Sequence, residues 1–290
     1  MIARYCAPET LDEALEILRA GAVSPFAGGT DLMPQSRAGR VKLAPVLMNL
    51  RRIEGLEGIA EDGGIVRIGA LTTMTRLMDC ALVRERLNIL WQACNHFASD
   101  QLRNAGTLGG NVCNASPAGD TLVPLLVLDA RVELAHKPNG RIETRKLPLA
   151  EFLRGPGRTA RTPQELLTAI EIALPAEGFY GAFFKLGTRP ALDISAISIG
   201  LGALRDGGRL QAVRIAFGAV ASPPRGARGG GARRPTARSG RDRCRGRRGR
   251  RRDSPDFRRA RLRLVSARDG VQHAAKDARR CPLTLISRLR

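Results

Sequence analysis

The sequence predicts an α+β fold, and two observations support this prediction: the alternation of segments along residues 1–221 and the length and composition of the whole chain. Segments with the apolar spacing of helices alternate with short strand-like runs along this whole part of the chain. At 290 residues with 43% hydrophobic side chains, the chain is long enough for two or three subdomains with buried cores. Because no apolar run reaches about eighteen residues and the N-terminus MIARYCAPETLDEA lacks an apolar signal region, we expect neither a membrane span nor export.

The opening of the chain predicts a strand, a helix, a strand and a loop. The segment APETLDEALEILRAG has a capping residue in Thr10 and a glutamate three positions later, at Glu13, as in a capping box. Its apolar residues line one helical face: Leu11, Ala14, Leu15 and Leu18. The next segment, AVSPFAG, has the composition of a short strand that leads into a glycine loop.

The middle of the chain continues this alternation. Residues Val46–Ile53 and Ile65–Thr73 have strand composition, and GLEGIAEDGG joins them as a hairpin-like connection. Residues Leu77–Ala98 are mostly helical by periodicity. We interpret Trp91, Cys94 and His96 within this helical region as packing residues rather than ligands.

The remaining elements up to residue 221 follow from composition in the same way. We expect, in order, a buried helix at 122–128, a strand at 130–136, a loop, short helix and strand between 147 and 174, a strand from 181, a helix or strand near 195–204, and a strand at 210–221.

A glycine-rich stretch from Gln101 to Asp120, QLRNAGTLGGNVCNASPAGD, is the first candidate site. It is too rich in glycine for a stable helix and too polar for a core strand, so we expect a loop. Without a Cβ atom, Gly106, Gly109 and Gly110 allow main-chain N–H groups to face a shared concavity, which suits phosphate oxygens. An ordinary long turn is the alternative.

A second stretch, SPFAGGTDLM (residues 24–33), favours the binding-site interpretation. It places Gly28 and Gly29 after a short apolar run, followed by Thr30 and Asp31. Two glycine loops in one short domain suggest one extended ligand that is held from both sides.

Cysteine spacing and charge narrow the possible functions. The six cysteines are scattered without a C-x-x-C pair, so we expect no disulfide framework, no metal site and a reducing cytoplasm. The net charge of +21 resides at one end: residues 223–290 hold 23 of the 48 Lys and Arg but only 5 of the 27 acidic residues. The first 222 residues therefore carry a net charge of only +3.

The composition changes abruptly at Ser222, and two interpretations of the tail stay open. Residues 223–252 are almost only Arg, Gly, Ala and Pro and cannot bury enough surface to order themselves. In one interpretation the tail binds nucleic acid by neutralising phosphates. In the other, which we favour, the reading frame has shifted after about residue 222.

Back-translation supports the shifted frame. Residues 256–260 (DFRRA), encoded GAT TTC CGA CGT GCG, read Ile-Ser-Asp-Val when the frame moves by one base. In the same frame, residues 268–278 (RDGVQHAAKDA) can read Glu-Met-Val-Ser-Asn-Met-Leu-Arg-Lys-Met-Leu, an amphipathic helix of good helix formers. The composition of residues 223–290 then says nothing about function.

The motifs together resemble a known family. AGGTDL (27–32), TLGGN (107–111) and ASP-x-x-D ending at Asp120 resemble the FAD-binding medium subunit of the molybdenum hydroxylases, the xanthine dehydrogenase and carbon monoxide dehydrogenase family. Further similar segments are RYCAPETLDEALEIL, MNLRRIEGLEGI, VRIGALTTMTRL and FFKLGTRPALDISAISIGL. The resemblance is collinear from residue 1 to about Ala221, and residues 256–278 resemble the family's C-terminal segment only in the shifted frame.

This resemblance implies a fold and a domain division. The fold would be the two-subdomain FAD-binding fold of the vanillyl-alcohol oxidase/PCMH type, followed by a disrupted small C-terminal α+β domain. Residues 1–175 would form the FAD-binding domain, with subdomains at about 1–55 and 56–175. Residues 176–222 would begin the C-terminal flavoprotein domain, and residues 223–290 would be an aberrant or disordered Arg/Gly-rich tail.

It also implies a set of FAD-binding residues. Thr30 and Thr107 would donate hydroxyl hydrogen bonds to phosphate oxygens, and Asp31 and Asp120 would accept from ribose hydroxyls or flavin N–H groups. The full set is Pro25, Phe26, Ala27, Gly28, Gly29, Thr30, Asp31, Leu32, Phe97, Thr107, Leu108, Gly109, Gly110, Asn111, Asp120, Leu167 and Lys185. No catalytic side chain and no metal ligand is expected.

The implied function is that of an oxidoreductase subunit. A molybdopterin-binding large subunit would oxidise the substrate, and a small subunit with two-iron clusters would pass electrons to the FAD of this chain for delivery to an external acceptor. The hydroxybenzoyl-CoA reductase branch is disfavoured because no cysteine-bearing insertion lies between Asn114 and Val132. NAD as acceptor is unsupported, since no G-x-G-x-x-G follows a strand.

Two other functions remain as alternatives. A nucleic-acid-binding protein would use the Arg-rich tail, but that function leaves both glycine stretches unexplained. A flavin-free structural subunit would keep the fold and lose the cofactor.

Overall fold

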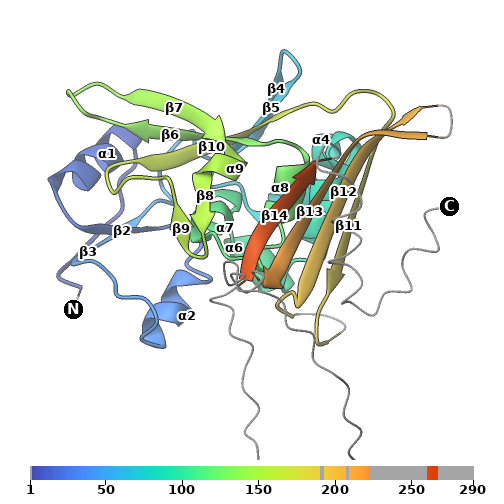
Figure 1. Ribbon diagram of the computed structural model, residues 1–290. Coiled ribbons are helices and arrows are strands. Elements are labelled where there is room, and N and C mark those ends of the chain that lie inside the picture. Colours follow the sequence, from blue (N-terminus) through green and yellow to red (C-terminus); the bar gives the residue numbers. More distant parts are fainter. Residues whose placement is uncertain (1, 190–192, 207–208, 222–259, 267–290) are drawn as a thin grey trace, which may run out of the picture.

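The computed structural model describes residues 2–189, 193–206, 209–221 and the backbone of 260–266. Three main sheets and a group of short helices make up this part of the chain (Figure 1). The expected frameshift and most of the expected tail lie outside the described residues.

The first sheet is small and parallel, with strand order β1-β3-β2. It comprises β1 (Arg4–Cys6), β2 (Val23–Phe26) and β3 (Val46–Asn49), with α1 (Leu11–Ala20) and α2 (Leu32–Arg37) in the connections. Thr10 caps α1 by accepting from the N–H of Glu13, as the sequence predicts. The predicted apolar face of α1 is buried in a core that includes Met48 and Ile53.

The second sheet has five antiparallel strands in the order β4-β5-β10-β6-β7. Their bounds are β4 Ile59–Asp62, β5 Ile65–Gly69, β6 Arg131–His136, β7 Glu143–Pro148 and β10 Leu166–Ala173. A separate short hairpin pairs β8 (Leu153–Gly155) with β9 (Arg158–Thr159). The segment expected as a hairpin-like connection between Val46–Ile53 and Ile65–Thr73 contains β4, which pairs with β5, whereas β3 belongs to the first sheet. The expectation that the connection joins those two strands as a hairpin was therefore wrong.

The helices between these strands are α3 (Met74–Asp79), α4 (Ala81–Arg86), α5 (Asn88–Asn95), α6 (Asp100–Ala105), α7 (Leu108–Asn114), α8 (Leu122–Val127) and α9 (Leu149–Phe152). The continuous helical region expected at 77–98 is thus three short helices. Cys94 is fully buried among them, and the indole N–H of Trp91 donates to the carbonyl of Met78 at 3.0 Å, in keeping with packing roles.

The glycine-rich stretch expected as a loop instead contains two helices, α6 and α7, and this expectation was wrong. Thr107 caps α7 by accepting from the N–H of Gly110 at 3.1 Å. Leu108 and Gly109 donate to the carbonyls of Thr72 and Ala70, both at 2.9 Å. These bonds to residues just after β5 stabilise a helix start that the glycine content alone disfavours.

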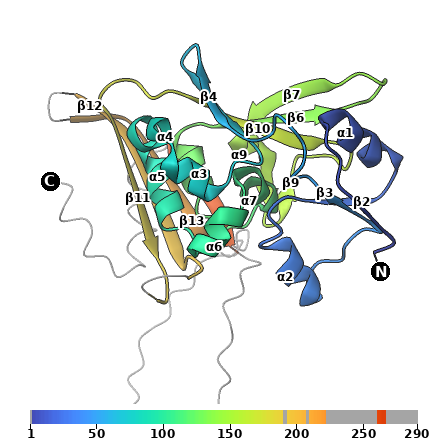
Figure 2. The ribbon, with the colours of Figure 1, turned by 180° about the vertical axis from the view of Figure 1, so that it is seen from behind.

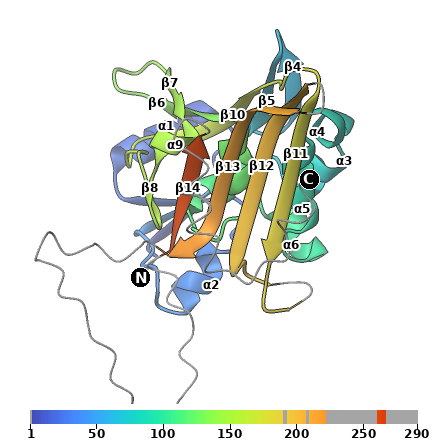
Figure 3. The same ribbon diagram turned by 45° about the vertical axis from the view of Figure 1, so that its right-hand side comes forward.

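The third sheet is antiparallel, with strand order β11-β12-β13-β14. Its strands are β11 (Phe179–Leu186), β12 (Ile197–Asp206), β13 (Arg209–Ala221) and β14 (Ala260–Ser266), and they lie side by side in Figure 3. The sequence analysis did not anticipate β14, although residues 261–264 alternate Arg and Leu. The helices α5 and α8 pack on one face of this sheet.

Candidate functional site

The two glycine-rich stretches touch each other. A Cβ atom at Gly28 would lie 2.0 Å from the carbonyl oxygen of Ala105 and 3.0 Å from the Cα of Gly106. Only glycine allows this approach, because real Cβ atoms do not come so close to backbone. In Figure 2 the turn between β2 and α2 accordingly lies beside α6 and α7. The two stretches that the sequence singled out are thus in direct backbone contact.

Thr30 and Phe97 lie around the same contact. A Cβ atom built on Gly106 would lie 3.5 Å from the Thr30 hydroxyl oxygen and 3.9 Å from a ring carbon of Phe97. Gly29 has a positive φ of 67°, a conformation that favours glycine. The first glycine stretch with the Thr30 hydroxyl, the Phe97 ring and the second glycine stretch thus come together from three places in the sequence.

The N–H groups of the first stretch remain open. Among the hydrogen bonds of the described residues, no protein acceptor receives the N–H of Gly28, Gly29 or Thr30. The carbonyl of Gly29 accepts from Met33 at 3.1 Å, and the Asp31 carboxylate accepts from the Gln35 amide. Consecutive open N–H groups on a glycine turn suit the oxygens of an anionic ligand.

The N–H groups of the second stretch are already used. Besides Leu108, Gly109 and Gly110, whose bonds hold the start of α7, Gly106 donates to the carbonyl of Leu102 at 2.7 Å. The expectation that these glycines turn their N–H groups toward a shared concavity was therefore wrong. Gly109 instead serves close packing, since a Cβ atom there would lie 2.7 Å from Ala70.

Asp120 and Lys185 form a buried ion pair. The Lys185 Nζ lies 2.6 Å from the Asp120 Oδ2 and donates to the carbonyl of His96 at 3.2 Å. The other carboxylate oxygen of Asp120 accepts from the Ser195 hydroxyl at 2.5 Å, and Ser195 is fully buried. Burial raises the pKa of Asp120, and the Lys185 ammonium and the hydrogen bonds counteract part of that rise.

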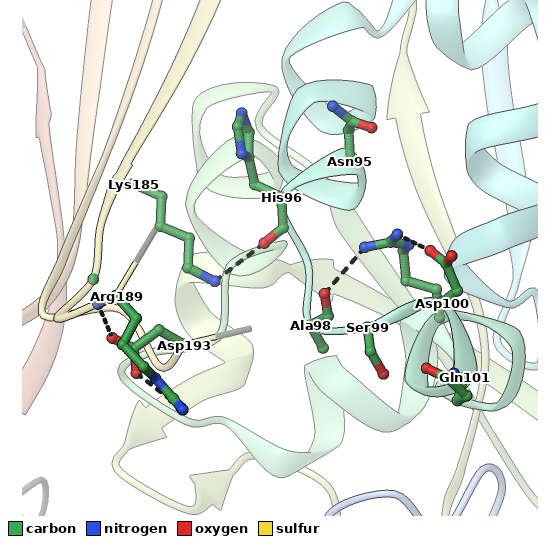
Figure 4. A pocket seen from close by; sticks show the side chains of 11 residues that line it. Asn95, His96, Ala98, Ser99, Asp100, Gln101, Lys185, Arg189 and Asp193 are labelled. Carbon is green, nitrogen blue, oxygen red and sulfur yellow. Dashed lines mark hydrogen bonds and ion pairs between the residues drawn. The ribbon is translucent and has the colours of Figure 1, made fainter. Parts of the chain in front are cut away.

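A pocket of about 450 Å³ opens beside this ion pair. Figure 4 shows its lining: Lys185, Arg189 and Asp193 from one side, and His96 with the residues that follow it from the other. Arg103 donates to the carbonyls of Phe97 and Ala98, at 2.6 and 3.1 Å, and so fixes the backbone that carries Phe97.

Asp193 organises the other wall of this pocket. Its carboxylate accepts from the Thr188 hydroxyl at 2.6 Å and from the N–H groups of Arg189 and Ile194 at 2.9 and 2.8 Å. Hydrogen bonds from Thr188 foremost lower the pKa of Asp193 to about 2. The carboxylate is therefore charged throughout the neutral range and holds Thr188 and Arg189 close to Ile194.

The remaining candidate residues lie on several different elements. Pro25 and Phe26 end β2, Ala27 packs on the N-terminal core, and Leu32 begins α2. Asn111, on α7, accepts from the Thr121 hydroxyl at 2.6 Å. Leu167 and Leu108 are core residues, 4% and 0% exposed.

Sequence reasoning missed three contributors to the site: Ser195, Arg103 and the main chain of His96. Ser195 stands in the DIS sequence only two residues after Asp193, and that proximity was an available signal. Nothing in the sequence distinguishes Arg103 from the other arginines. Among the described residues, no cluster of His, Cys, Asp and Glu could hold a metal ion, and no helix is long and apolar enough to span a membrane.

The contact between the glycine stretches lies beside N–H groups that donate to no protein acceptor among the described residues. Comparison with known proteins identifies the class, because residues 1–175 match the family described as the FAD binding domain in molybdopterin dehydrogenase. The chain belongs to this family, and it is an FAD-binding subunit of the oxidoreductase type. The match confirms the fold class and the cofactor that the sequence predicted.

Individual relatives agree with this assignment. The chain is 34% identical over 226 residues to the xanthine dehydrogenase FAD-binding subunit of Escherichia coli O157:H7. The aligned residues make up 77% of this chain and 75% of that relative. It is 32% identical over 222 residues to the carbon monoxide dehydrogenase medium chain of Afipia carboxidovorans, and the aligned residues make up 76% of this chain and 75% of that relative. The structure of carbon monoxide dehydrogenase from Hydrogenophaga pseudoflava matches with a TM-score of 0.71 at 30% identity, covering 75% of each chain.

Proposed function

We propose that this chain is the electron-transfer subunit of a multi-subunit molybdenum hydroxylase. Electrons would reach its FAD from two-iron clusters in a small partner subunit and leave to an external acceptor, while a molybdopterin-binding large subunit oxidises the substrate. The relatives named as medium chains and FAD-binding subunits support this assignment. The free thiols of Cys6, Cys80, Cys94 and Cys113 fit a reducing cytoplasm.

The contact between Gly28 and residues 105–106 is the observation that carries the proposal. It brings the open N–H groups of Gly28, Gly29 and Thr30 next to the Phe97 ring, so that a diphosphate and a ring system can be held at neighbouring places. The N–H groups neutralise phosphate charge without a lysine or arginine. Phe97 offers an apolar face beside them.

Asp120 and Lys185 would act as a pair rather than separately. Because both oxygens of the Asp120 carboxylate already accept hydrogen bonds, its main role is to hold the Lys185 ammonium in place. An ammonium has three donors, and the His96 carbonyl and Asp120 use two of them. The third can donate to a cofactor oxygen from the edge of the pocket.

Bound FAD accepts electrons singly and releases them singly or in pairs, and this property joins one-electron clusters to two-electron acceptors. The chain supplies binding, orientation and charge.

The two alternatives receive less support. Nucleic-acid binding would depend on residues 223–290, which lie almost wholly outside the described part of the chain, whereas the first 222 residues have a net charge of only +3. A flavin-free structural subunit would have no use for the open N–H groups at residues 28–30.

Flavin content tests the proposal directly. The purified protein should show flavin absorbance near roughly 370 and 450 nm and release stoichiometric FAD on denaturation. Thr30→Val keeps the shape of the side chain and removes its hydroxyl, so it should weaken FAD binding by about tenfold, as expected for one lost hydrogen bond to a charged group. Thr159→Val, on the β8–β9 hairpin, serves as a matched control.

Either of two results would contradict the proposal. A folded protein that neither contains nor takes up FAD would remove the cofactor claim. A flavin-loaded protein whose FAD is not reduced when the partner subunits and their substrate are supplied would keep the cofactor and refute electron transfer.

A further inference from the structure

Strand β11 forms one edge of the third, C-terminal sheet, because β12 is the only described strand that pairs with it. Edge strands present main-chain N–H and C=O groups that no neighbouring strand receives. On β11 the side chain of Gln92, from α5, takes this place. Its amide oxygen accepts from the N–H of Phe183 at 2.8 Å, and its amide nitrogen donates to the carbonyl of Gly181 at 3.3 Å. A single amide group therefore bonds to the edge as a further strand would.

The amide of Gln92 is itself held by its own helix. Its nitrogen also donates to the side-chain oxygen of Asn88, one turn earlier on α5. A Cβ atom built on Gly181 would lie 2.9 Å from the Cβ of Ile89, so α5 packs directly on β11 just before Gln92. Figure 2 shows α5 alongside β11. Both contacts restrict the positions from which the amide can reach the strand.

The Gln92 contact and the Lys185 contact with the same helix follow each other along both elements. Four residues after Gln92, the carbonyl of His96 accepts from the Lys185 ammonium at 3.2 Å, as Figure 4 shows. Four residues advance a helix by about 6 Å. From Phe183 to Lys185 the strand advances two residues, or about 6.6 Å. The two contacts therefore require one and the same offset between α5 and β11.

The end of α5 attracts the Lys185 ammonium only while that offset is kept. His96 follows the last residue of α5, and the carbonyls at a helix C-terminus lack helical partners and carry negative partial charge. The other partner of the ammonium, the Asp120 carboxylate, is not on α5 and cannot hold the helix against the strand. A lysine side chain is long and flexible, so the place of its ammonium depends on both partners.

We propose that Gln92 is a positioning residue for the Lys185 ammonium. It bonds to the main chain at the edge of β11 and so fixes the offset at which the end of α5 and Lys185 meet. The inference rests on the proposed function, in which the third donor of this ammonium binds a cofactor oxygen. Gln92 does not line the pocket itself and acts on the cofactor site only through Lys185.

The first test needs no cofactor. Gln92→Met keeps the approximate length of the side chain and removes both bonds to β11. In the flavin-free protein, mass-mapped acetylation with acetic anhydride should modify Lys185 about fivefold faster in this variant than in the parent, as expected for the loss of about one net hydrogen bond. Lys137 is the internal control, because its side chain is 9% exposed against 10% for Lys185 and it contacts α1 instead. Its rate should not change.

The second test is a titration with FAD in two backgrounds. In the parent, Gln92→Met should raise the Kd for FAD about fivefold. In a protein that carries both Lys185→Met and Asp120→Asn, which removes the ion pair without leaving a buried charge, Gln92→Met should have no further effect. Gln164→Met makes the same exchange at an exposed residue and should bind FAD like the parent. If Gln92→Met does not fold, Gln92→Asn, which shortens the side chain by one carbon, replaces it with the same expectations.

Two results would overturn the inference. One is an acetylation rate of Lys185 that the variant leaves unchanged, or that rises together with the rate of Lys137. The other is an equal loss of FAD affinity in both backgrounds, which would mean that Gln92 acts on the site without Lys185. A parent protein that binds no FAD would instead refute the proposed function, and the acetylation rates would still decide whether Gln92 positions the ammonium.

Discussion

Removal of the Lys185 ammonium should expose how much the protein depends on the buried ion pair. Lys185→Met keeps the length of the side chain and leaves Asp120 buried, with only Ser195 as a hydrogen-bond donor. The two paired side chains are 10% and 7% exposed. Breaking a buried pair on one side costs about 3–5 kcal/mol, which corresponds to a Tm decrease of about 6–20 °C in a protein of this size.

The pH dependence of this loss has a definite sign. Burial already raises the pKa of Asp120 above the model-compound value of 3.8, and loss of the ammonium removes the main opposing influence. A carboxyl whose folded pKa is raised favours folding most at low pH, and this contribution is lost as the pH rises through the folded pKa. The Tm difference between Lys185→Met and the parent should therefore be small at pH 4 and grow toward pH 7.

Differential scanning calorimetry of the flavin-free proteins between pH 4 and 8 is the assay. Adding Asp120→Asn to Lys185→Met removes the unpaired buried negative charge and should recover most of the decrease in Tm. Lys137→Met is the matched control, because that lysine also contacts two carboxylates, at 2.7 and 2.9 Å, but both are substantially exposed. A pH-independent loss, or an equal loss in the control, would refute the reasoning.

Two further predictions concern glycine and cysteine. Gly28→Ala should lower stability by about 1–3 kcal/mol and abolish measurable FAD binding, because its Cβ would overlap the Ala105 carbonyl. Gly21→Ala has nothing within 4 Å of the added atom, and titration of both variants with FAD should find it like the parent. Burial raises the pKa of Cys94 to about 12, so mass-mapped alkylation at pH 8 should modify Cys80 long before Cys94. Equal rates of alkylation would contradict the buried position of Cys94.

The sequence predicted the alternation of elements because apolar spacing and capping act locally. The helix α1, with Thr10 as its cap, formed as expected for this reason. The sequence could not predict that α7 is helical, because the carbonyl groups that accept hydrogen bonds from its first turn belong to Ala70 and Thr72, more than thirty residues earlier. Helix propensity is a weak prior, and tertiary hydrogen bonds outweighed it here.

The candidate site shows the same division. Glycine content correctly indicated a close backbone approach, yet the sequence could not say that Gly28 meets the other glycine-rich stretch itself. Nor could it show that Asp120 is occupied by Lys185 and Ser195, which lie 65 and 75 positions later. The motifs indicated which residues to consider, but only the fold shows which of their hydrogen-bonding groups have no protein partner among the described residues.

The arrangement of the site also explains how the C-terminal sheet bears on the cofactor. The open N–H groups at residues 28–30 lie between β2 and α2, whereas Lys185 lies on β11 and Ser195 just before β12. A loosened C-terminal sheet would therefore remove the ammonium near the pocket and leave the glycine contact intact. A change that loosens this sheet should therefore lower FAD affinity rather than abolish it. This graded outcome separates a flavoprotein from a flavin-free structural subunit, in which FAD binding would be absent whether or not the sheet is intact.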